Sequence, residues 1–395
     1  VYLKPGKEES LKRFHPWVFS GAIHHIEGEP EEGEIVDVYT SKKEFIACGH
    51  FQIGSIAVRV LTFRQKEIDH DFWKHRLEVA YDLRRSLGLA GNPINNTYRL
   101  VHGEGDNLPG LIIDVYDHTA VMQAHSAGMH VYRMEIAEAL SEVMGDVVQN
   151  IYYKSETTLP FKADLEPENG FIKGGSPENI AMEYGLKFHV DWLKGQKTGF
   201  FLDQKYNRLA IQKLCKDAKV LDCFTYIGTF ALNAGIAGAQ SVLGVDASQF
   251  AVDLANENSK FNGLEDTVKF ECHDVFDFLP ELEAQGELFD MVILDPPAFT
   301  KSRASIKNAI KGYREINMRG MKLVKDGGYL ATCSCSHFMD YDTFTKTIGQ
   351  AAKLVHKRLR QVEFRTQAAD HPILWNGDEN SYYLKFYIFQ VVDEK

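Results

Sequence analysis

An acid and a thiol near the end of this sequence occupy positions that suit covalent chemistry. Asp295 follows the apolar run Met291–Leu294 in Leu-Asp-Pro-Pro-Ala-Phe, and Cys335 lies in Ser-Cys-Ser, close behind the apolar run 329–332. Each run predicts a buried strand, and ligands bind where neighbouring strands end in an open parallel sheet. An acid and a thiol at two such ends favour covalent chemistry on a planar, electron-poor ring.

The elements that must position these residues are short apolar runs that alternate with helical segments from about residue 187 onward. The runs predict strands at 220–224, 241–246, 268–272, 291–294 and 328–333, and helices are predicted between them, for instance at 250–262 and 314–323. This alternation is typical of a doubly wound α/β sheet. The sequence therefore predicts an α/β domain over residues 187–395.

Two further domains are expected before this one. Residues 1–68 indicate a small β module, with strand candidates at 34–39, 45–49 and 56–63 between glycine-containing and charged turns. Residues 69–186 indicate an α+β domain with helices at 71–87 and 129–144 and a strand between turns within 99–114. The segment 166–178 combines Gly, Pro and charged residues, which predicts a hairpin or a linker.

Composition narrows the class of protein. A chain of 395 residues with a formal net charge of −11 is not a generally basic nucleic-acid binder, although local positive patches remain compatible with phosphate binding. The six cysteines show neither a disulfide framework nor CxxC spacing, which favours reduced thiols. No stretch has the length and apolarity of a membrane span, and no signal-peptide pattern is present. We expect a soluble, cytoplasmic protein without a membrane partner.

The first turn of the α/β domain argues against a dinucleotide. Only Gly228 occupies the turn after the strand at 220–224, so the G-x-G-x-x-G fingerprint of a pyrophosphate site is missing. Acids instead follow successive strands and suit the hydroxyl and amine groups of a nucleotide-like ligand without a pyrophosphate. They are Asp222, Asp246, Asp274 and Asp295. The alternative for each acid alone is a helix N-cap.

Several motifs carry a family resemblance. In the α/β domain they are Asp222-x-Phe224-x-x-x-Gly228-x-Phe230, Val245-Asp246-Ala247-Ser248, the Leu294–Phe299 segment and Ser334-Cys335-Ser336. This set resembles the class I S-adenosylmethionine-dependent RNA methyltransferases and, more narrowly, the RlmI-type enzymes of the large ribosomal subunit. Residues 12–17 are similar to the start of that family's N-terminal PUA domain, 103–110 to its central domain, and 195–204 to the segment leading into its cofactor site.

The resemblance covers nearly the whole chain and implies a fold, a cofactor and a substrate. It implies a Rossmann-like methyltransferase domain at the C-terminus, preceded by a small β-rich PUA-like domain and a central α+β domain. It also implies S-adenosylmethionine as cofactor and a ribosomal RNA cytosine as substrate. The residues that it places at the cofactor are Gln204, Asp222, Phe224, Tyr226, Gly228, Asp246, Asp274 and Asp295.

The chemistry of such a reaction requires a thiolate. Carbon 5 of cytosine is a weak nucleophile, but addition of a thiolate to carbon 6 makes it reactive enough to attack a sulfonium methyl. The resemblance selects Cys335 for this role, and Asp295 would bind nitrogen 3 of the ring as charge develops there. The residues do not identify the base that removes the proton from carbon 5.

Two other interpretations of the cysteines stay open. Cys333 lies two residues before Cys335, so on a strand both point to the same face, and one or both would simply pack in the core. The run from Cys333 to His337 also looks metal-binding, but structural zinc needs four ligands and no second cluster is present. We therefore predict no metal. Ala298 stands where a related subgroup of cytosine methyltransferases has a second cysteine, which puts a two-cysteine mechanism in doubt.

Two groups of residues suit contacts with RNA. Lys12, Arg13 and Trp17 combine charge with ring surface, as recognition of unstacked RNA requires. The alternative is that Trp17 and its aromatic neighbours pack the small domain. Phe299 is a candidate for stacking on the target base, and Lys301 and Arg303 for contacts with phosphate. The alternative for these two basic residues is an exposed helix face.

These observations predict formation of 5-methylcytosine in large-subunit (23S) ribosomal RNA. One alternative is a methyltransferase that acts without covalent help on a nitrogen of guanine or adenine. Another is a non-catalytic RNA-binding factor of ribosome assembly. The sequence does not determine which nucleotide is modified or what the oligomeric state is. It is compatible with a homodimer.

Overall fold

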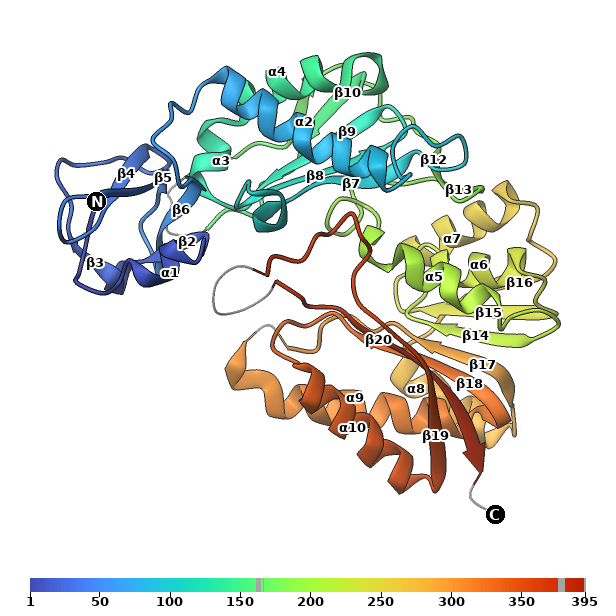
Figure 1. Cartoon of the computed structure of the whole chain (residues 1–395). Helices are drawn as coiled ribbons and strands as arrows, with labels where there is room; N and C mark the ends of the chain where they lie inside the picture. The colour runs from blue at the N-terminus through green and yellow to red at the C-terminus, as the bar shows by residue number, and fades with distance from the viewer. Residues whose placement is uncertain (161–164, 166, 301, 376–380, 394–395) are drawn as a thin grey trace. The chain divides into compact units, whose positions relative to one another are not determined.

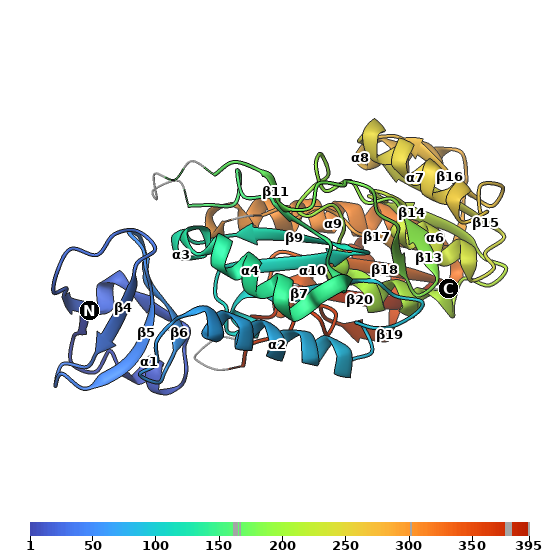
Figure 2. The same cartoon turned by 90° about the horizontal axis from the view of Figure 1, so that it is seen from above.

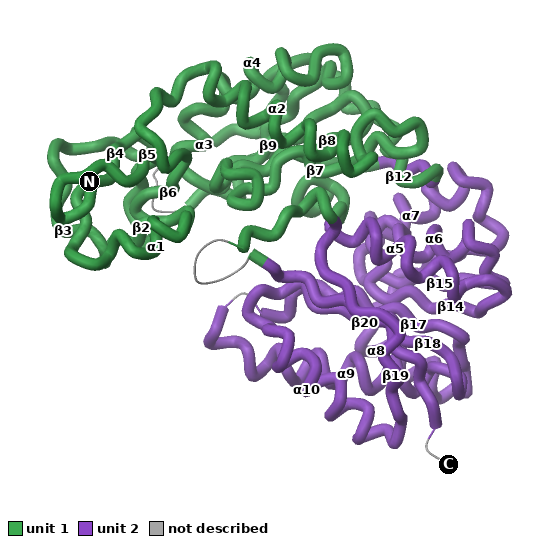
Figure 3. The backbone as a smooth tube through the Cα atoms, in the orientation of Figure 1, with its two compact units in different colours: residues 1–185, 190–202, 369–381 green, residues 186–189, 203–368, 382–395 purple. Residues whose placement is uncertain are grey.

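The computed structural model describes residues 1–160, 165, 167–300, 302–375 and 381–393. The chain divides into two compact units, which Figure 3 draws in different colours. Unit 1 contains residues 1–185, 190–202 and 369–381, and unit 2 contains residues 186–189, 203–368 and 382–395. No helix in the described part of the chain has the length and apolarity needed to cross a membrane.

The N-terminal β module forms a six-stranded sheet in unit 1 with the order β2-β6-β5-β4-β1-β3. Alternate apolar side chains, such as Val38, Ala47 and Val58, point to one face and make a small core. The predicted strands are present as β4, β5 and β6. The elements of this module are β1 (Tyr2–Leu3), α1 (Glu9–Lys12), β2 (Trp17–Phe19), η1 (Ser20–Ala22), β3 (Ile23–His25), β4 (Ile35–Tyr39), β5 (Phe45–Phe51) and β6 (Ile56–Thr62).

A second sheet of unit 1 has five strands in the order β11-β10-β9-β8-β7. Helices α2 and α4 pack together and cover one face of it (Figures 1 and 2). Its elements are α2 (His70–Ser86), β7 (Thr97–His102), η2 (Gly103–Asp106), β8 (Leu111–Tyr116), β9 (Thr119–Ala124), α3 (Ala127–Val131), α4 (Arg133–Met144), η3 (Gly145–Val147), β10 (Asn150–Tyr153) and β11 (Gly170–Lys173). The division of the chain at 68/69 and 186/187 stays a prediction, because this sheet shares unit 1 with the β module.

One predicted helix of unit 1 is interrupted. The segment expected as a single helix over 129–144 consists of α3 and α4, which are separated at Tyr132. Ser126 caps α3 by accepting a hydrogen bond from the backbone N–H of Met129. Tyr132 then leaves the helical conformation, and its ring stacks on His50 with 5.2 Å between ring centroids. The helical pattern is thus interrupted at the residue whose ring stacks on His50.

Unit 2 contains a seven-stranded sheet in the order β16-β15-β14-β17-β18-β20-β19. The first five strands are parallel, and β20 and β19 add antiparallel pairs at one edge. Helices α5, α6 and α7 cover one face, and α8, α9 and α10 cover the other (Figure 1). This arrangement confirms the predicted Rossmann-like, doubly wound α/β domain.

The elements of unit 2 follow the predicted alternation closely. The strands predicted at 220–224, 241–246, 268–272, 291–294 and 328–333 are present, whereas β19 and β20 were not predicted. Helix α9 begins at Ile306 rather than at Arg314. The elements are α5 (Lys205–Gln212), β14 (Lys219–Cys223), α6 (Thr229–Ile236), β15 (Ser241–Asp246), α7 (Gln249–Phe261), β16 (Val268–Cys272), α8 (Val275–Ala284), β17 (Phe289–Leu294), η6 (Arg303–Ser305), α9 (Ile306–Lys322), β18 (Val324–Ser334), α10 (Tyr341–Leu354), β19 (Lys357–Arg365) and β20 (Lys385–Asp393). Along the chain, three short elements follow β11 and precede α5: β12 (Ala181–Glu183), β13 (Leu186–Phe188) and η5 (Leu202–Gln204).

The register of unit 2 brings the ends of three parallel strands to one edge. Cys223 of β14 pairs with Leu294 of β17, which in turn pairs with Thr332 of β18. Ser334, the last residue of β18, pairs with Lys385 at the start of antiparallel β20. The strand order reverses between β14 and β17, and open α/β sheets bind their ligands beside such a reversal.

Candidate active site

Asp295 is the centre of a hydrogen-bonded cluster at the carboxyl end of β17. Its Oδ1 accepts a hydrogen bond from Cys333 Sγ at 2.9 Å and another from Gln204 Nε2 at 3.1 Å. Asn207 Nδ2 donates to Gln204 Oε1 at 2.6 Å, which orients the Gln204 amide. Desolvation raises the pKa of Asp295 to about 6, against the lowering effect of these two donors. The carboxyl can therefore carry a proton near neutral pH.

The two neighbouring cysteines differ in environment. Cys333 lies on β18, only 1% exposed, and burial raises the pKa of its thiol well above the ordinary value. Cys335 lies beyond the end of β18 at Ser334, so the predicted common face does not apply to it. Its side chain is half-buried, which leaves it accessible. Because the thiolate is the nucleophile, Cys333 is unsuited to attack and Cys335 is the accessible candidate.

Hydrogen bonds fix the backbone on both sides of Cys335. Ser334 Oγ donates to the hydroxyl of Tyr313, on α9, at 3.0 Å. Ser336 Oγ donates to the carbonyl of Thr300 at 2.9 Å, and Ser336 N donates to Ser334 Oγ at 3.4 Å. The Ser-Cys-Ser motif thus uses both serines to attach the cysteine to the Asp-Pro-Pro-Ala-Phe-Thr segment and to α9.

Asp222 supplies a buried carboxylate at the end of β14. Its Oδ2 accepts hydrogen bonds from Thr225 Oγ1 at 2.6 Å and from Ala231 N at 3.0 Å. Its Oδ1 is buried without a hydrogen-bond partner among the described residues. Burial raises the pKa of Asp222 to about 7. A buried acceptor without a donor is rare, and here it suits a cofactor that brings amine or hydroxyl donors.

The loop after β14 has an unusual backbone. Phe224, Tyr226 and Gly228 have φ values of 62°, 51° and 86°, all in the left-handed region. Strain of this kind, roughly 1–3 kcal/mol for each non-glycine residue, persists mainly where a site requires it. Gly228 is necessary because a Cβ there would lie 2.6 Å from the ring of Phe270. The N–H of Tyr226 donates to Asp246 Oδ2 at 2.9 Å, which attaches the loop to the end of β15.

The other two acids also serve the backbone. Asp246 Oδ1 accepts a hydrogen bond from Ser248 N at 3.0 Å. Asp274 is exposed and caps α8 by accepting from Phe276 N at 2.9 Å, which is the helix-cap alternative considered above. Each carboxylate oxygen has two lone pairs, so these bonds leave both groups able to accept a further donor. Their cofactor contacts stay predictions.

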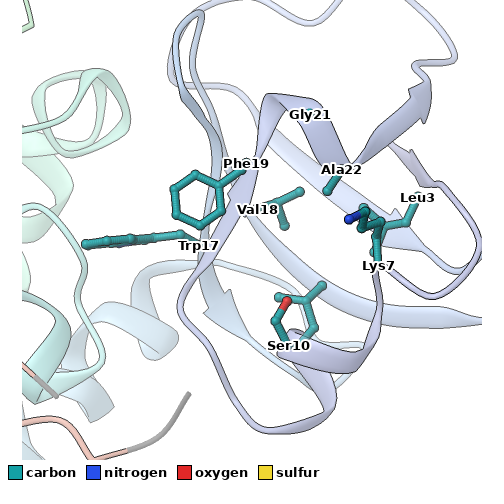
Figure 4. A pocket seen from close by; sticks show the side chains of 9 residues that line it. Leu3, Lys7, Ser10, Trp17, Val18, Phe19, Gly21 and Ala22 are labelled. Carbon is teal, nitrogen blue, oxygen red and sulfur yellow. The ribbon is translucent and has the colours of Figure 1, made fainter. Parts of the chain in front are cut away.

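The aromatic residues around Trp17 lie at the surface of unit 1. Phe14 and Phe19 are 54% and 45% exposed, and Lys12 and Arg13 are exposed beside them. Trp17 is half-buried, and its Nε1 donates to Glu104 Oε1 at 2.9 Å. Figure 4 shows the adjacent pocket of about 340 Å³, which is lined by Leu3, Lys7, Ser10, Leu11, Trp17, Val18, Phe19, Gly21 and Ala22. Phe14 and Phe19 are therefore largely outside the core of the β module.

The residues after the Asp-Pro-Pro segment divide into core and surface. The ring of Phe299 lies 4.6 Å from that of Tyr313 and 5.9 Å from that of Phe276, measured between centroids, so it packs against the core of unit 2. Arg303 is exposed in η6, as its predicted phosphate contact requires. Lys301 lies outside the described residues.

Unit 2 thus brings together residues that are far apart in the sequence. The carboxyl edge of its sheet collects Asp222, Asp295, Gln204 and Cys335, whereas Lys12, Arg13 and Trp17 belong to unit 1. The sequence interpretation missed Asn207 and the role of Cys333 as a donor to Asp295, because neither stands in a recognisable motif. Among the described residues, no group of three or more His, Cys, Asp or Glu side chains could hold a metal ion.

Comparisons with known proteins identify the family to which the chain is similar. A family model of S-adenosylmethionine-dependent methyltransferases matches residues 170–369, and a model of a PUA-like domain matches residues 1–63. The chain is 40% identical over 398 residues to the Ribosomal RNA large subunit methyltransferase I of Alteromonas mediterranea, covering 100% of this chain and 99% of that protein. The protein of the same name from Pseudoalteromonas translucida is 40% identical over 400 residues, with 99% of both chains covered.

Solved structures show the same fold at lower sequence identity. A Streptococcus mutans protein assigned to the SAM-dependent methyltransferases has a TM-score of 0.83 at 20% identity, over 99% of both chains. A solved structure of a protein assigned as a methyltransferase and complexed with SAH gives the same values. The likeness extends over both units of the chain.

Proposed function

We propose that this chain, which belongs to the Ribosomal RNA large subunit methyltransferase I family of S-adenosylmethionine-dependent methyltransferases, forms 5-methylcytosine in large-subunit ribosomal RNA through a covalent adduct with Cys335. Membership of the family gives the cofactor and a ribosomal RNA substrate. The choice of carbon 5 and the covalent route are the proposal. They rest on the contrast between the two cysteines at the end of β18.

That contrast is the observation that carries the proposal. Cys333 is a buried thiol that donates to Asp295, whereas Cys335 is accessible and lies between two serines that fix its backbone. Methylation of a ring nitrogen needs no nucleophilic sulfur, because the nitrogen lone pair attacks directly. A fixed, accessible cysteine at the same sheet edge as Asp295 is what covalent activation of carbon 5 requires.

The reaction divides between the cofactor and the residues of the chain. S-adenosylmethionine supplies an electrophilic methyl group when it is bound. The thiolate of Cys335 forms a bond to carbon 6 of cytosine, and the displaced ring electrons make carbon 5 nucleophilic. Asp295, whose pKa burial raises to about 6, donates its proton toward nitrogen 3 as negative charge develops there. Once carbon 5 carries the methyl group, a base takes up its proton and the carbon–sulfur bond breaks, which returns the thiolate of Cys335. The proton on nitrogen 3 goes back to Asp295.

The residues of the cofactor site act by position. Asp222 Oδ1, which has no hydrogen-bond partner in the described part of the chain, would accept from an amine or hydroxyl donor of the cofactor. The loop 224–228, with its three residues of positive φ, would shape the space beside it. Gln204 would act as a positioning residue, because it donates to both Asp295 and Cys333. Asp246 and Asp274 would contribute their remaining lone pairs.

The RNA would be bound by charge and aromatic surface together. Lys12, Arg13 and the half-buried ring of Trp17 lie beside the exposed Phe14 and Phe19, a combination that suits unstacked bases. The target cytosine must leave its stack before a thiol can reach carbon 6. Arg303 would contribute a phosphate contact, and Phe299 would support the site through its packing.

A trapping experiment tests the covalent route. RNA that contains 5-fluorocytosine cannot lose a proton from carbon 5, so the wild-type protein with S-adenosylmethionine should form a stable adduct with it. Cys335→Ala should form none, and the neighbouring Cys333→Ala should still form the adduct. Normal methylation by Cys335→Ala would favour the non-covalent alternative on a purine nitrogen. An adduct that maps to another residue would keep the covalent route but refute the role of Cys335.

A further inference from the structure

Lys385 is a buried lysine at the first position of β20. It pairs in register with Ser334, the residue before Cys335, and its side chain is 1% exposed. Its Nζ donates to the carbonyl of Ser336 at 2.6 Å and to the carbonyl of Tyr383 at 2.7 Å. One of its two acceptors is thus the residue that follows Cys335. No part of the proposed methyl transfer described above uses this side chain.

The surroundings of Lys385 contain no carboxylate at ion-pair distance within the described part of the chain. The groups around it are the thiols of Cys335 and Cys333, the carboxylate of Asp340, which lies beyond ion-pair distance, and the ring of Tyr382, whose centroid lies 5.5 Å from Nζ. Burial lowers the pKa of Lys385 to about 8, against the opposing effect of these acidic groups. A buried ammonium is usually paired, because desolvation without a counter-ion is costly.

An ammonium group has three N–H donors, and two of them are used by the carbonyls of Ser336 and Tyr383. Both carbonyls favour the protonated form of the amine. We propose that Lys385 is an electrostatic positioning residue that stabilises the thiolate of Cys335, with that thiolate as a counter-ion of the buried ammonium. This inference rests on the proposed role of Cys335 as nucleophile.

The proton balance of this step is simple. The S–H bond of Cys335 breaks, its proton passes to solvent, and Lys385 keeps all three of its protons. The positive charge favours the anion, since a thiolate close to a cation is stabilised relative to the thiol. When cytosine binds, the thiolate forms its bond to carbon 6 and the ammonium remains in place. When the adduct breaks down, the same charge stabilises the departing thiolate.

The experiment measures the thiol without RNA. The full-length protein is alkylated with limiting iodoacetamide, and the rate at Cys335 is followed by peptide mass spectrometry, with the exposed Cys272 as internal standard. Lys385→Gln removes the charge but keeps two N–H donors for the two carbonyls. We expect alkylation of Cys335 at pH 7 to fall about tenfold relative to Cys272, which corresponds to about one pKa unit, with the pH profile displaced to higher pH.

Two variants make this result specific. Lys385→Arg keeps the charge and should restore most of the alkylation rate at Cys335. Lys346→Met removes one positive charge from the exposed surface of α10 and should leave the rate unchanged. If Lys385→Gln does not fold, as judged by circular dichroism, the comparison uses Lys385→Met and Lys385→Arg in the same way.

Several outcomes would overturn the inference. An unchanged rate at Cys335 in the folded Lys385→Gln protein would do so, and so would an equal loss in the Gln and Arg variants, because that result indicates packing rather than charge. The 5-fluorocytosine trap separates this test from the proposed function. Slower alkylation of Cys335 without any trapped RNA would support the role of Lys385 and refute the covalent methylation. An unchanged alkylation rate together with trapped RNA would refute the role of Lys385 and support the covalent methylation.

Discussion

Asp222 allows a quantitative test of how unit 2 accommodates a buried acid. The side chain is 0% exposed, and burial raises its pKa from 3.8 to about 7. Asn in its place keeps an oxygen that can accept from Thr225 and Ala231 but carries no charge. Asp222→Asn therefore changes the free energy of unfolding in a way that depends on pH.

The sign follows from the direction of the shift. The folded protein binds the Asp222 proton more tightly than the unfolded chain does, so ionisation of Asp222 destabilises the fold. This destabilisation is absent below about pH 4, grows as the pH rises, and is complete above about pH 7. The pKa difference of 7 − 3.8 = 3.2 corresponds to about 4 kcal/mol at roughly 1.4 kcal/mol for each unit.

We therefore expect the stability of Asp222→Asn relative to wild type to increase by about 4 kcal/mol between pH 4 and pH 8. The unpaired amide N–H groups of the variant add a contribution that does not depend on pH and cancels in this comparison. Urea unfolding followed by circular dichroism measures both proteins at each pH. Asp274→Asn, at an exposed helix cap, is the control and should change stability by less than about 0.5 kcal/mol.

A difference between Asp222→Asn and wild type that stays constant from pH 4 to pH 8 would refute this reasoning. It would mean that the carboxylate of Asp222 is compensated in the folded protein. The same variant should lose affinity for S-adenosylmethionine, as measured by calorimetry, because an amide nitrogen or a neutral oxygen replaces the unpaired carboxylate oxygen. Greater stability with weaker cofactor binding is the combined signature that we expect.

Three further predictions concern the site and the RNA surface. Asp295→Asn should lower the single-turnover rate of methyl transfer by about 10²–10³-fold, because it removes the proton donated toward nitrogen 3. Calorimetry should show that cofactor binding is retained, and an unchanged rate would exclude Asp295 as the proton donor. Gly228→Ala should weaken cofactor binding and lower the melting temperature, because φ is 86° and the new Cβ would lie 2.6 Å from Phe270; wild-type values in both assays would contradict the argument. Trp17→Ala should weaken RNA binding in a fluorescence titration by about 1–3 kcal/mol, the value for one base stacked on the ring, and should leave the rate at saturating RNA unchanged. An RNA affinity equal to that of the wild type would exclude stacking on Trp17.

The local sequence was sufficient to predict the parallel part of the unit 2 sheet. Strands buried on both faces are nearly continuous apolar runs, as in β14 and β17, and the edge strand β16 alternates buried and exposed residues, so both kinds are evident in the sequence. The same holds for the residues directly after them, which is why Asp222, Asp295 and the Ser-Cys-Ser motif could be placed at one edge. Strands β19 and β20 were missed. The side chains of β19 are half-buried or exposed, and its polar composition gives no comparable signal, whereas β20 is a buried apolar run that the sequence interpretation overlooked.

The tertiary structure decided the features that depend on partners far away in the chain. Whether β18 ends before or after Cys335 follows from its pairing with β17 and β20, and this ending separates the accessible Cys335 from the buried Cys333. The approach of Gln204 to Asp295 and of Lys385 to Ser336 likewise comes from packing between distant segments. Periodicity and turn residues act over a few positions. The sequence by itself therefore determined the helices, most strands, and the reactive residues that follow the strands. Burial and strand pairing act across the whole unit, and they determined which of those groups share a site and which charges they carry.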